Sequence, residues 1–325
     1  MSKLKAYVRL LRPHQYYKNL LVFLGLVFAA QVFEVDNYPP LLLAFVGLCA
    51  VSSASYVLND WRDIGLDRAH PEKKNRPLAA GTVSIPEAMV LVVILLVVAG
   101  LTVVLVPISD GNLVLYLLLL VAVFTTSQTY SLYFKNQPFY DVTFIALNYI
   151  WRAVTGVVVI NVTLSPWLFI LGFLFALFLA LSKRKGDLAL LGEDAAKHKP
   201  VFRVYTNGLL DQLVILISGA MIVAYSIYVV EAVVDHSRGL QDYAKFQNPS
   251  LMLLTLPVVT LVIMRLIFLQ FSGTASSRKA ELLFLDKQIV ALGVIVGLLT
   301  FAALFWDELS LQSLVDLFYQ GLRLW

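Results

Sequence analysis

Nine long apolar segments dominate this chain and restrict it to a membrane-embedded fold. They cover about residues 19–33, 40–58, 88–107, 112–130, 139–160, 166–182, 209–230, 250–271 and 288–306. Most of them approach the ~20 apolar residues that an α-helix needs to cross a bilayer. Charged residues make up only 14% of the chain, against about 25% in soluble domains. The sequence therefore predicts an all-α integral membrane protein, a bundle of nine transmembrane helices.

Positive charge is concentrated on one side of these predicted spans. Of the 25 Lys and Arg residues, 20 precede the first span or follow the second, fourth, sixth and eighth. The positive-inside rule then places the N-terminus and these loops in the cytoplasm, in a multi-pass protein of the cytoplasmic membrane. Anionic lipid headgroups and phosphates are the expected partners, and nucleic acid is not.

The chain shows no linker or low-complexity segment, so we expect a single domain over residues 1–325. Apolar residues recur at helical spacing among the basic residues before the first span: Leu4, Tyr7, Val8 and Leu11. This pattern predicts a short interfacial helix over about 2–12. Cys49 is the only cysteine, which excludes an intramolecular disulfide and a thiolate metal site. The sequence does not decide whether the protein forms a homo-oligomer.

An amide and three carboxylates stand at the end of the second apolar segment: Asn59, Asp60, Asp63 and Asp67. On a helix these four residues fall within an arc of roughly 100° on one face. Ionisable groups at a membrane edge are functional candidates. Carboxylates that share a face suit a hard divalent cation, and Mg²⁺ takes one or two carboxylates together with waters and substrate phosphates. We predict a Mg²⁺ site here; a solvated acidic helix end is the alternative.

Candidate phosphate-binding residues follow on the same predicted side of the membrane. Arg76 lies in the loop after the acids, and Lys135 is the only charge in the short loop that begins near Tyr130. The loop after the sixth span carries a basic cluster with one acid, followed by a second basic segment: Lys183, Arg184, Asp187 and Arg203. These loops and the acidic face predict a polar cavity on the cytoplasmic side. Lys73 and Lys74 are interpreted as topological charges, and His70 as a loop residue.

Arg152 interrupts the fifth predicted span. A buried arginine must be paired or must face a cavity. Asp141 is too far along the helix to be its partner one turn away. A structural ion pair and a contact to a substrate phosphate are both compatible with the sequence.

The run Asn-Asp-x-x-Asp-x-x-x-Asp at 59–67 resembles the first aspartate motif of the UbiA superfamily of intramembrane prenyltransferases. Within that superfamily the chain is most similar to the polyprenyl-phosphate (decaprenyl-phosphate) phosphoribosyltransferase branch. The similarity is carried by residues 12–19, 68–71, 76–81, 183–188 and 199–206. Most members have a second acidic motif after the sixth span, where this chain has Lys183-Arg184-Lys185 and only Asp187. The phosphoribosyl branch is likewise basic there, although it usually has Glu in place of Asp187.

The resemblance implies a reaction that moves a 5-phosphoribosyl group from phosphoribosyl pyrophosphate to a polyprenyl phosphate, releases pyrophosphate and feeds arabinan precursor synthesis for the cell envelope. It implies Asp60, Asp63 and Asp67 as catalytic Mg²⁺ ligands that hold the pyrophosphate, oriented by Asn59. Lys183 and Arg184 are expected at the donor phosphates, and Gln15 and Lys18 at the lipid phosphate. The remaining substrate-binding candidates are Arg76, Tyr130, Lys135, Arg152, Asp187 and Arg203.

Two other functions remain open at this stage. The same fold could transfer a prenyl group from a prenyl diphosphate to an aromatic or other acceptor, which a second acidic motif would favour. A membrane transporter is the other alternative, but the chain shows no convincing internal repeat and gathers its polar residues at one face.

Overall fold

Eight helices in the described part of the chain are long and apolar enough to cross a membrane. The structure is a computed structural model, and it describes residues 3–69, 73–192, 195–237, 246–272, 285–307 and 309. Every regular element within these ranges is helical. The spanning helices are α3 (Tyr38–Arg62), α5 (Ile85–Leu105), α6 (Asp110–Thr129), α7 (Tyr140–Val159), α8 (Pro166–Leu191), α10 (Asn207–Ser237), α11 (Met252–Phe271) and α13 (Lys287–Leu304).

The first predicted span is the exception. The chain from Pro13 forms the 3₁₀ helix η1 (Pro13–Phe23), which continues into the short α2 (Leu24–Phe28). The prediction of nine spanning α-helices is therefore corrected to eight among the described residues. A 3₁₀ helix rises about 2.0 Å per residue against 1.5 Å in an α-helix. The pair thus extends over roughly 30 Å, close to the thickness of a bilayer core.

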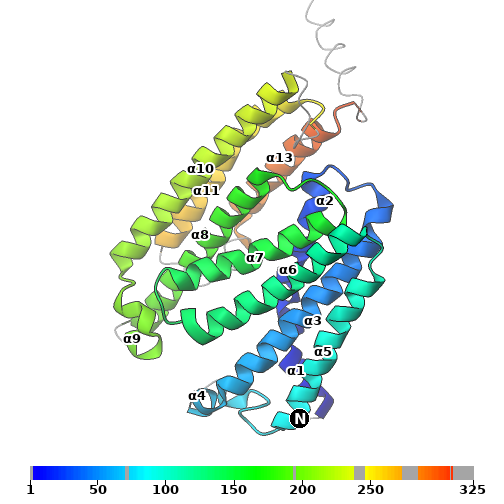
Figure 1. The fold of residues 1–325 in the computed structure, drawn as a ribbon. Coiled ribbons are helices and arrows are strands. Elements are labelled where there is room, and N and C mark those ends of the chain that lie inside the picture. Colours follow the sequence, from blue (N-terminus) through cyan, green and yellow to red (C-terminus); the bar gives the residue numbers. More distant parts are fainter. Residues whose placement is uncertain are drawn as a thin grey trace, which may run out of the picture. The chain divides into compact units, whose positions relative to one another are not determined.

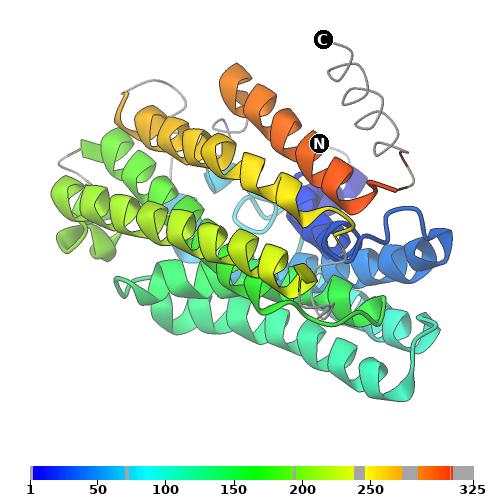
Figure 2. The same cartoon turned by 90° about the horizontal axis from the view of Figure 1, so that it is seen from above.

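Contacts divide the chain into two units, residues 1–164 and 165–325. In the first unit, α3 packs against α5, α6, α7 and η1, and α7 packs against α6 and η1. A helix, α1 (Lys3–Leu11), lies where the interfacial helix is predicted over about 2–12, and it packs on α3. In the second unit, α10 packs against α8 and α11, and α11 packs against α13, which lies beside it in Figure 2.

The core of the first unit surrounds α3, which is the most enclosed of the spanning helices. Leu41, Leu48 and Val51 of α3 are buried with Tyr116 of α6. The buried Tyr116 hydroxyl forms a 2.8 Å hydrogen bond with Thr102 Oγ1 of α5. Enclosure of α3 matters for function because the acidic residues stand at its C-terminal end.

Close backbone contact holds η1 against α7. A Cβ built at Gly156 of α7 would collide with the backbone carbonyl of Val22. Backbone cannot move aside as a flexible side chain can, so we expect Gly156→Ala to destabilise the protein by about 1–3 kcal/mol. Thermal unfolding in detergent measures this. Gly100→Ala in α5 is the matched control, because no atom lies within 4 Å of its added Cβ, and equal melting of both variants would contradict this packing.

Candidate active site

The three carboxylates keep helical spacing across the end of α3. Asp60 lies in the last turn of α3, Asp63 follows it, and Asp67 lies on α4 (Ile64–Ala69). The Asp63 amide donates to the Asn59 carbonyl at 3.0 Å, and the Asp67 amide donates to the Asp63 carbonyl at 2.8 Å. The i→i−4 bonding therefore continues through the junction and keeps the acids on one face. Asp60 and Asp67 are each 3% exposed, so two of the three carboxylates are removed from water.

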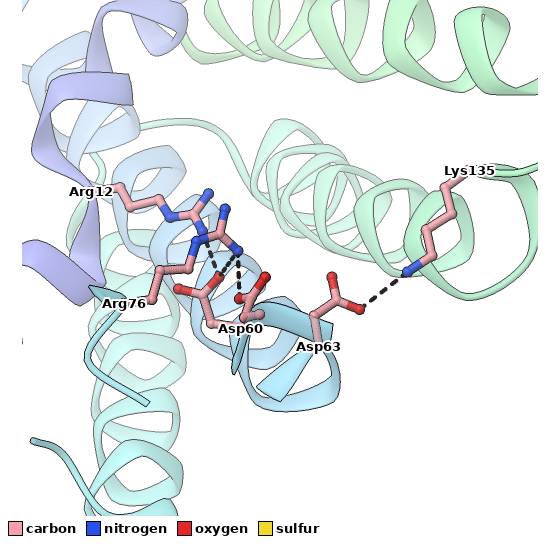
Figure 3. Close-up of polar contacts among 6 residues, drawn as sticks. Arg12, Asp60, Asp63, Arg76 and Lys135 are labelled. Atoms are coloured by element: carbon pink, nitrogen blue, oxygen red, sulfur yellow. Dashed lines mark hydrogen bonds and ion pairs between the residues drawn. The ribbon is translucent and has the colours of Figure 1, made fainter. Parts of the chain in front are cut away.

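Basic side chains neutralise this acidic face, as Figure 3 shows. Arg76 Nη1 bridges two carboxylates, at 3.0 Å from Asp60 Oδ1 and 2.8 Å from Asp67 Oδ2. Arg12 Nη2 donates to the same Asp60 oxygen at 2.5 Å. Lys135 Nζ lies 3.2 Å from Asp63 Oδ1. The structure thus brings two of the predicted phosphate-binding residues, Arg76 and Lys135, directly to the predicted metal ligands.

Arg12 is a site residue that the sequence analysis did not assign. It lies between α1 and η1 with φ of 55°, a left-handed conformation that few residues other than glycine adopt. This conformation carries the guanidinium to Asp60 and over the Tyr56 ring, 5.1 Å from its centre. The only signal in the sequence was its place as the first residue of the segment 12–19.

The π-helical turn η4 (Tyr130–Phe134) places Lys135. It follows α6 directly, and the Lys135 amide donates to the Tyr130 carbonyl at 2.7 Å. Such π-turns are rare and occur often at functional sites. The backbone carbonyl of Tyr130 is therefore bonded to Lys135, which contacts the acidic face.

Gln15 and Lys18 lie on η1, at its half-buried surface. The Gln15 amide donates to the Arg12 carbonyl at 2.9 Å, so Gln15 sits one turn beyond the Arg12 bend. Lys18 Nζ lies 5.8 Å from the centre of the Tyr17 ring. His70, which the sequence analysis interpreted as a loop residue, lies outside the described residues.

The oxygen atoms of Asn59 and the three carboxylates are the type of ligand that binds a divalent cation. Within the described ranges, no three acidic, His or Cys side chains converge closely enough to hold a metal ion. However, the Asn59 Oδ1 atom is buried without a hydrogen-bond partner. It adds a hard oxygen beside three carboxylates, which is the ligand chemistry that Mg²⁺ prefers. The guanidinium of Arg76 occupies the place between Asp60 and Asp67, so these two acids already share one cationic partner.

Arg152 of α7 is buried in the same unit, 5% exposed. Its Nε donates to Asn19 Oδ1 at 2.8 Å and its Nη1 donates to the Asn148 carbonyl at 2.6 Å. The structural ion pair that the sequence left open does not form among the described residues, and Asp141 is not a partner of Arg152.

The predicted basic cluster lies in the second unit, at the C-terminal end of α8. Lys183 is exposed, whereas Arg184 is buried and its Nη1 lies 3.4 Å from Asp187 Oδ2. Lys199 Nζ lies 2.5 Å from the same oxygen. Arg203, in the 3₁₀ turn η6 (Pro200–Arg203), is exposed. Partial burial and the neighbouring Arg184 guanidinium lower the pKa of Lys199, against the opposing effect of the Asp187 carboxylate.

The fold and these side chains define a multi-pass helical membrane protein with carboxylates and basic groups at helix ends. Comparison with known proteins identifies the class more closely. The UbiA prenyltransferase family matches residues 20–207. The chain therefore belongs to the UbiA prenyltransferase family.

Two relatives and two solved structures illustrate the similarity. The decaprenyl-phosphate phosphoribosyltransferase of Mycolicibacterium smegmatis is 32% identical over 68% of this chain and 69% of its own length. The enzyme of that name from Mycobacterium tuberculosis is 30% identical over 69% of this chain and 74% of its length. A UbiA homologue from Archaeoglobus fulgidus bound to DMAPP and Mg²⁺ has a TM-score of 0.65, 18% identity, and covers 92% of this chain and 98% of its own. The same homologue bound to GPP and Mg²⁺ has a TM-score of 0.63, 18% identity, and covers 92% and 99%.

Proposed function

We propose that this UbiA-family transferase moves a 5-phosphoribosyl group from phosphoribosyl pyrophosphate to a polyprenyl phosphate and releases pyrophosphate. The relatives named decaprenyl-phosphate phosphoribosyltransferase support this donor and acceptor. The observation that carries the choice is the charge of the cluster on α8. Among the described residues, Asp187 is shared by Arg184 and Lys199, and Asp211 pairs with Lys185. The four basic residues Lys183, Arg184, Lys185 and Lys199 outnumber these two carboxylates, so the cluster is cationic. A cationic cluster binds phosphate groups directly and does not need a second metal.

The proposed transfer reaction needs charged protein groups but few others. The bond from ribose C1 to the pyrophosphate oxygen breaks, and a bond from C1 to a lipid phosphate oxygen forms. The acceptor is already an anion, so no general base is needed. Mg²⁺ held by Asp60, Asp63 and Asp67 would neutralise charge on the departing pyrophosphate. Arg12, Arg76 and Lys135, paired with these acids in the structure, are suited to bind phosphate oxygens once the acids hold a metal.

The acceptor is anchored by its lipid tail and must reach ribose C1 from the membrane. We assign Gln15 and Lys18 of η1 to the membrane edge of this path. In this proposal η1 and α2 form a ninth crossing, and the N-terminus, the acids and the basic cluster are each on the cytoplasmic side of the membrane. Asn59 orients the pyrophosphate, with Tyr130 and Arg203 as further substrate contacts.

A donor screen tests the proposal. Purified protein with Mg²⁺ and a polyprenyl phosphate is offered labelled phosphoribosyl pyrophosphate or labelled prenyl diphosphate, the latter also with an aromatic acceptor. We expect label in the lipid phosphate only from phosphoribosyl pyrophosphate. Transfer of the prenyl group alone would establish the alternative enzyme of the same family.

Lys199 makes donor use depend on pH. A bound phosphate favours the charged amine, whereas the pKa of the free Lys199 amine is already lowered. Raising the pH through that lowered pKa, below the ordinary value of 10.5, should therefore raise the donor KM. Lys199→Arg stays charged throughout and should flatten this rise. A wild-type KM profile that Lys199→Arg leaves unchanged would exclude Lys199 as the titrating group.

A further inference from the structure

Arg152 lies deep in α7 and is surrounded by uncharged groups. Besides its bonds to Asn19 and to the Asn148 carbonyl, its Nη1 donates to the Asn148 side chain and its Nη2 lies 3.5 Å from Ser52 Oγ. These acceptors come from α7 itself, from η1 and from α3. The three elements therefore surround the guanidinium with polar side chains inside the apolar bundle. We call these residues the Arg152 niche (Asn19, Ser52, Asn148 and Arg152).

The charge in this niche has no counter-charge in the part of the chain that the structure describes. The titratable side chains that act on Arg152 are Tyr56, Tyr149 and Cys49, and none of them is a carboxylate. Neutral acceptors satisfy N–H donors but leave the positive charge uncompensated, and such a charge is costly in a dry interior. Arg12 and Arg76 in the same unit differ, because both lie against carboxylates. Arg152 thus has the surroundings of a residue that binds an external anion.

A polar stripe on α3 joins the niche to the acidic face. It consists of Cys49, Ser52, Ser53, Tyr56 and Asp60. These residues fall within an arc of about 100° on the helix. Residues of η1 cover the stripe, since Asn19 Nδ2 donates to Cys49 Sγ at 3.1 Å and the Tyr16 hydroxyl bonds Ser53 Oγ at 2.8 Å. Ser52 precedes Asp60 by eight residues, so the niche lies about 12 Å further into the span than the acids.

We propose that the Arg152 niche binds the phosphate of the lipid acceptor, a phosphate monoester on a long isoprenoid tail. This inference rests on the proposed function. The position favours this ligand because a free phosphate would have to leave water and descend past the acids, whereas a lipid phosphate carries an apolar tail that the bundle can accept. The donor pyrophosphate belongs at the acids, so an acceptor held about two helical turns deeper meets the ribose from the membrane side. Lys18 then serves at the entrance and Arg152 at the final position.

The test measures binding without turnover. The full-length protein in detergent and EDTA is titrated with a long-chain polyprenyl phosphate, with the corresponding polyprenol, and with inorganic phosphate. The key variant is Asn19→Asp, which keeps an oxygen near Arg152 Nε and supplies the missing negative charge inside the protein. We expect it to remain folded and to bind polyprenyl phosphate about tenfold or more weakly, because hydrogen bonds to charged groups are strong. Polyprenol binding should not change.

Further variants separate a binding role from a structural one. Arg152→Lys keeps the charge but loses the fork of donors, and should weaken binding of the lipid phosphate less than Arg152→Gln. Arg62→Gln is the control, because Arg62 is an exposed arginine of α3 that donates to Gln128 at 2.7 Å. It should bind all three ligands as the wild type does.

The outcomes distinguish the inference from the proposed function. If the wild type binds polyprenyl phosphate no better than polyprenol, the acceptor of the proposed function is wrong. If it binds the lipid phosphate selectively and folded Asn19→Asp and Arg152→Lys bind it equally well, the proposed function stands and the Arg152 niche is only structural. If inorganic phosphate alone is lost in Asn19→Asp, the niche binds a free anion and the lipid assignment is overturned.

Discussion

Asp63→Ala and Asp67→Ala should each lower turnover by at least about 100-fold, because both remove a carboxylate that is proposed to hold Mg²⁺ against the departing pyrophosphate. The protein should stay folded. Arg76 retains Asp60 as a partner when Asp67 is lost, since Nη1 lies 3.0 Å from Asp60 Oδ1. Asp63 and Lys135 are both partly exposed, and Lys135 is the one ionic partner of Asp63 among the described residues. Steady-state transfer of labelled phosphoribosyl groups, with melting in detergent, measures both effects.

EDTA should produce the same loss in the wild type, and added Mg²⁺ should restore it. Asp36→Asn is the matched control, because Asp36 is an exposed acid of the 3₁₀ turn η2 (Val35–Asn37), at the start of α3 and remote from its acidic end. It should retain full activity. Full activity of both alanine variants, or of the wild type in EDTA, would refute the metal assignment.

The acidic face was predictable because its geometry is local. Four residues at helical spacing share a face whatever else the chain does, and the hydrogen bonds from Asp63 and Asp67 continue the spacing across the helix end. Of the nine spanning helices that the apolar runs predicted, eight are found among the described residues, since length and hydropathy alone decide that property. The 3₁₀ form of η1 was missed. Only its last residues, from Leu20, belong to an apolar run, and its close approach to Gly156 of α7 is a tertiary contact that no local signal reveals.

The partners of the acids were not predictable for the same reason. Arg12 is separated from Asp60 by 48 residues, and Lys135 from Asp63 by 72. From the sequence alone, Arg12 and Lys135 were only positive charges near the membrane edge. The bond from Arg152 to Asn148 follows helical spacing, but its bond to Asn19 spans 133 residues. The apolar pattern therefore placed the spanning helices, whereas the pairing of charges depended on how η1, α3, η4 and α7 pack.

The basic cluster on α8 should determine use of the donor. We expect Lys183→Ala and Arg184→Ala each to lower kcat/KM for phosphoribosyl pyrophosphate by about 10- to 100-fold, since a hydrogen bond to a charged group is worth about 1.5–3 kcal/mol. Arg184 is the more demanding test. It is buried and lies 3.4 Å from Asp187. After its removal, Asp187 would keep Lys199 as an ionic partner. Varying the donor at saturating lipid phosphate measures the effect, and melting of each variant identifies loss of fold.

Lys73→Ala and Lys74→Ala are the matched controls for the basic cluster. Both lysines are exposed in the 3₁₀ turn η3 (Lys73–Asn75), on the side of the membrane that the charge pattern assigns to the cytoplasm. If positive charge serves only to orient the chain, all four substitutions should act alike, through the amount of protein inserted. If the cluster binds donor phosphates, Lys183→Ala and Arg184→Ala should change the kinetic constants of correctly inserted protein, and the two controls should not. Equal kinetic constants in all four variants would mean that the cluster on α8 contributes topology alone.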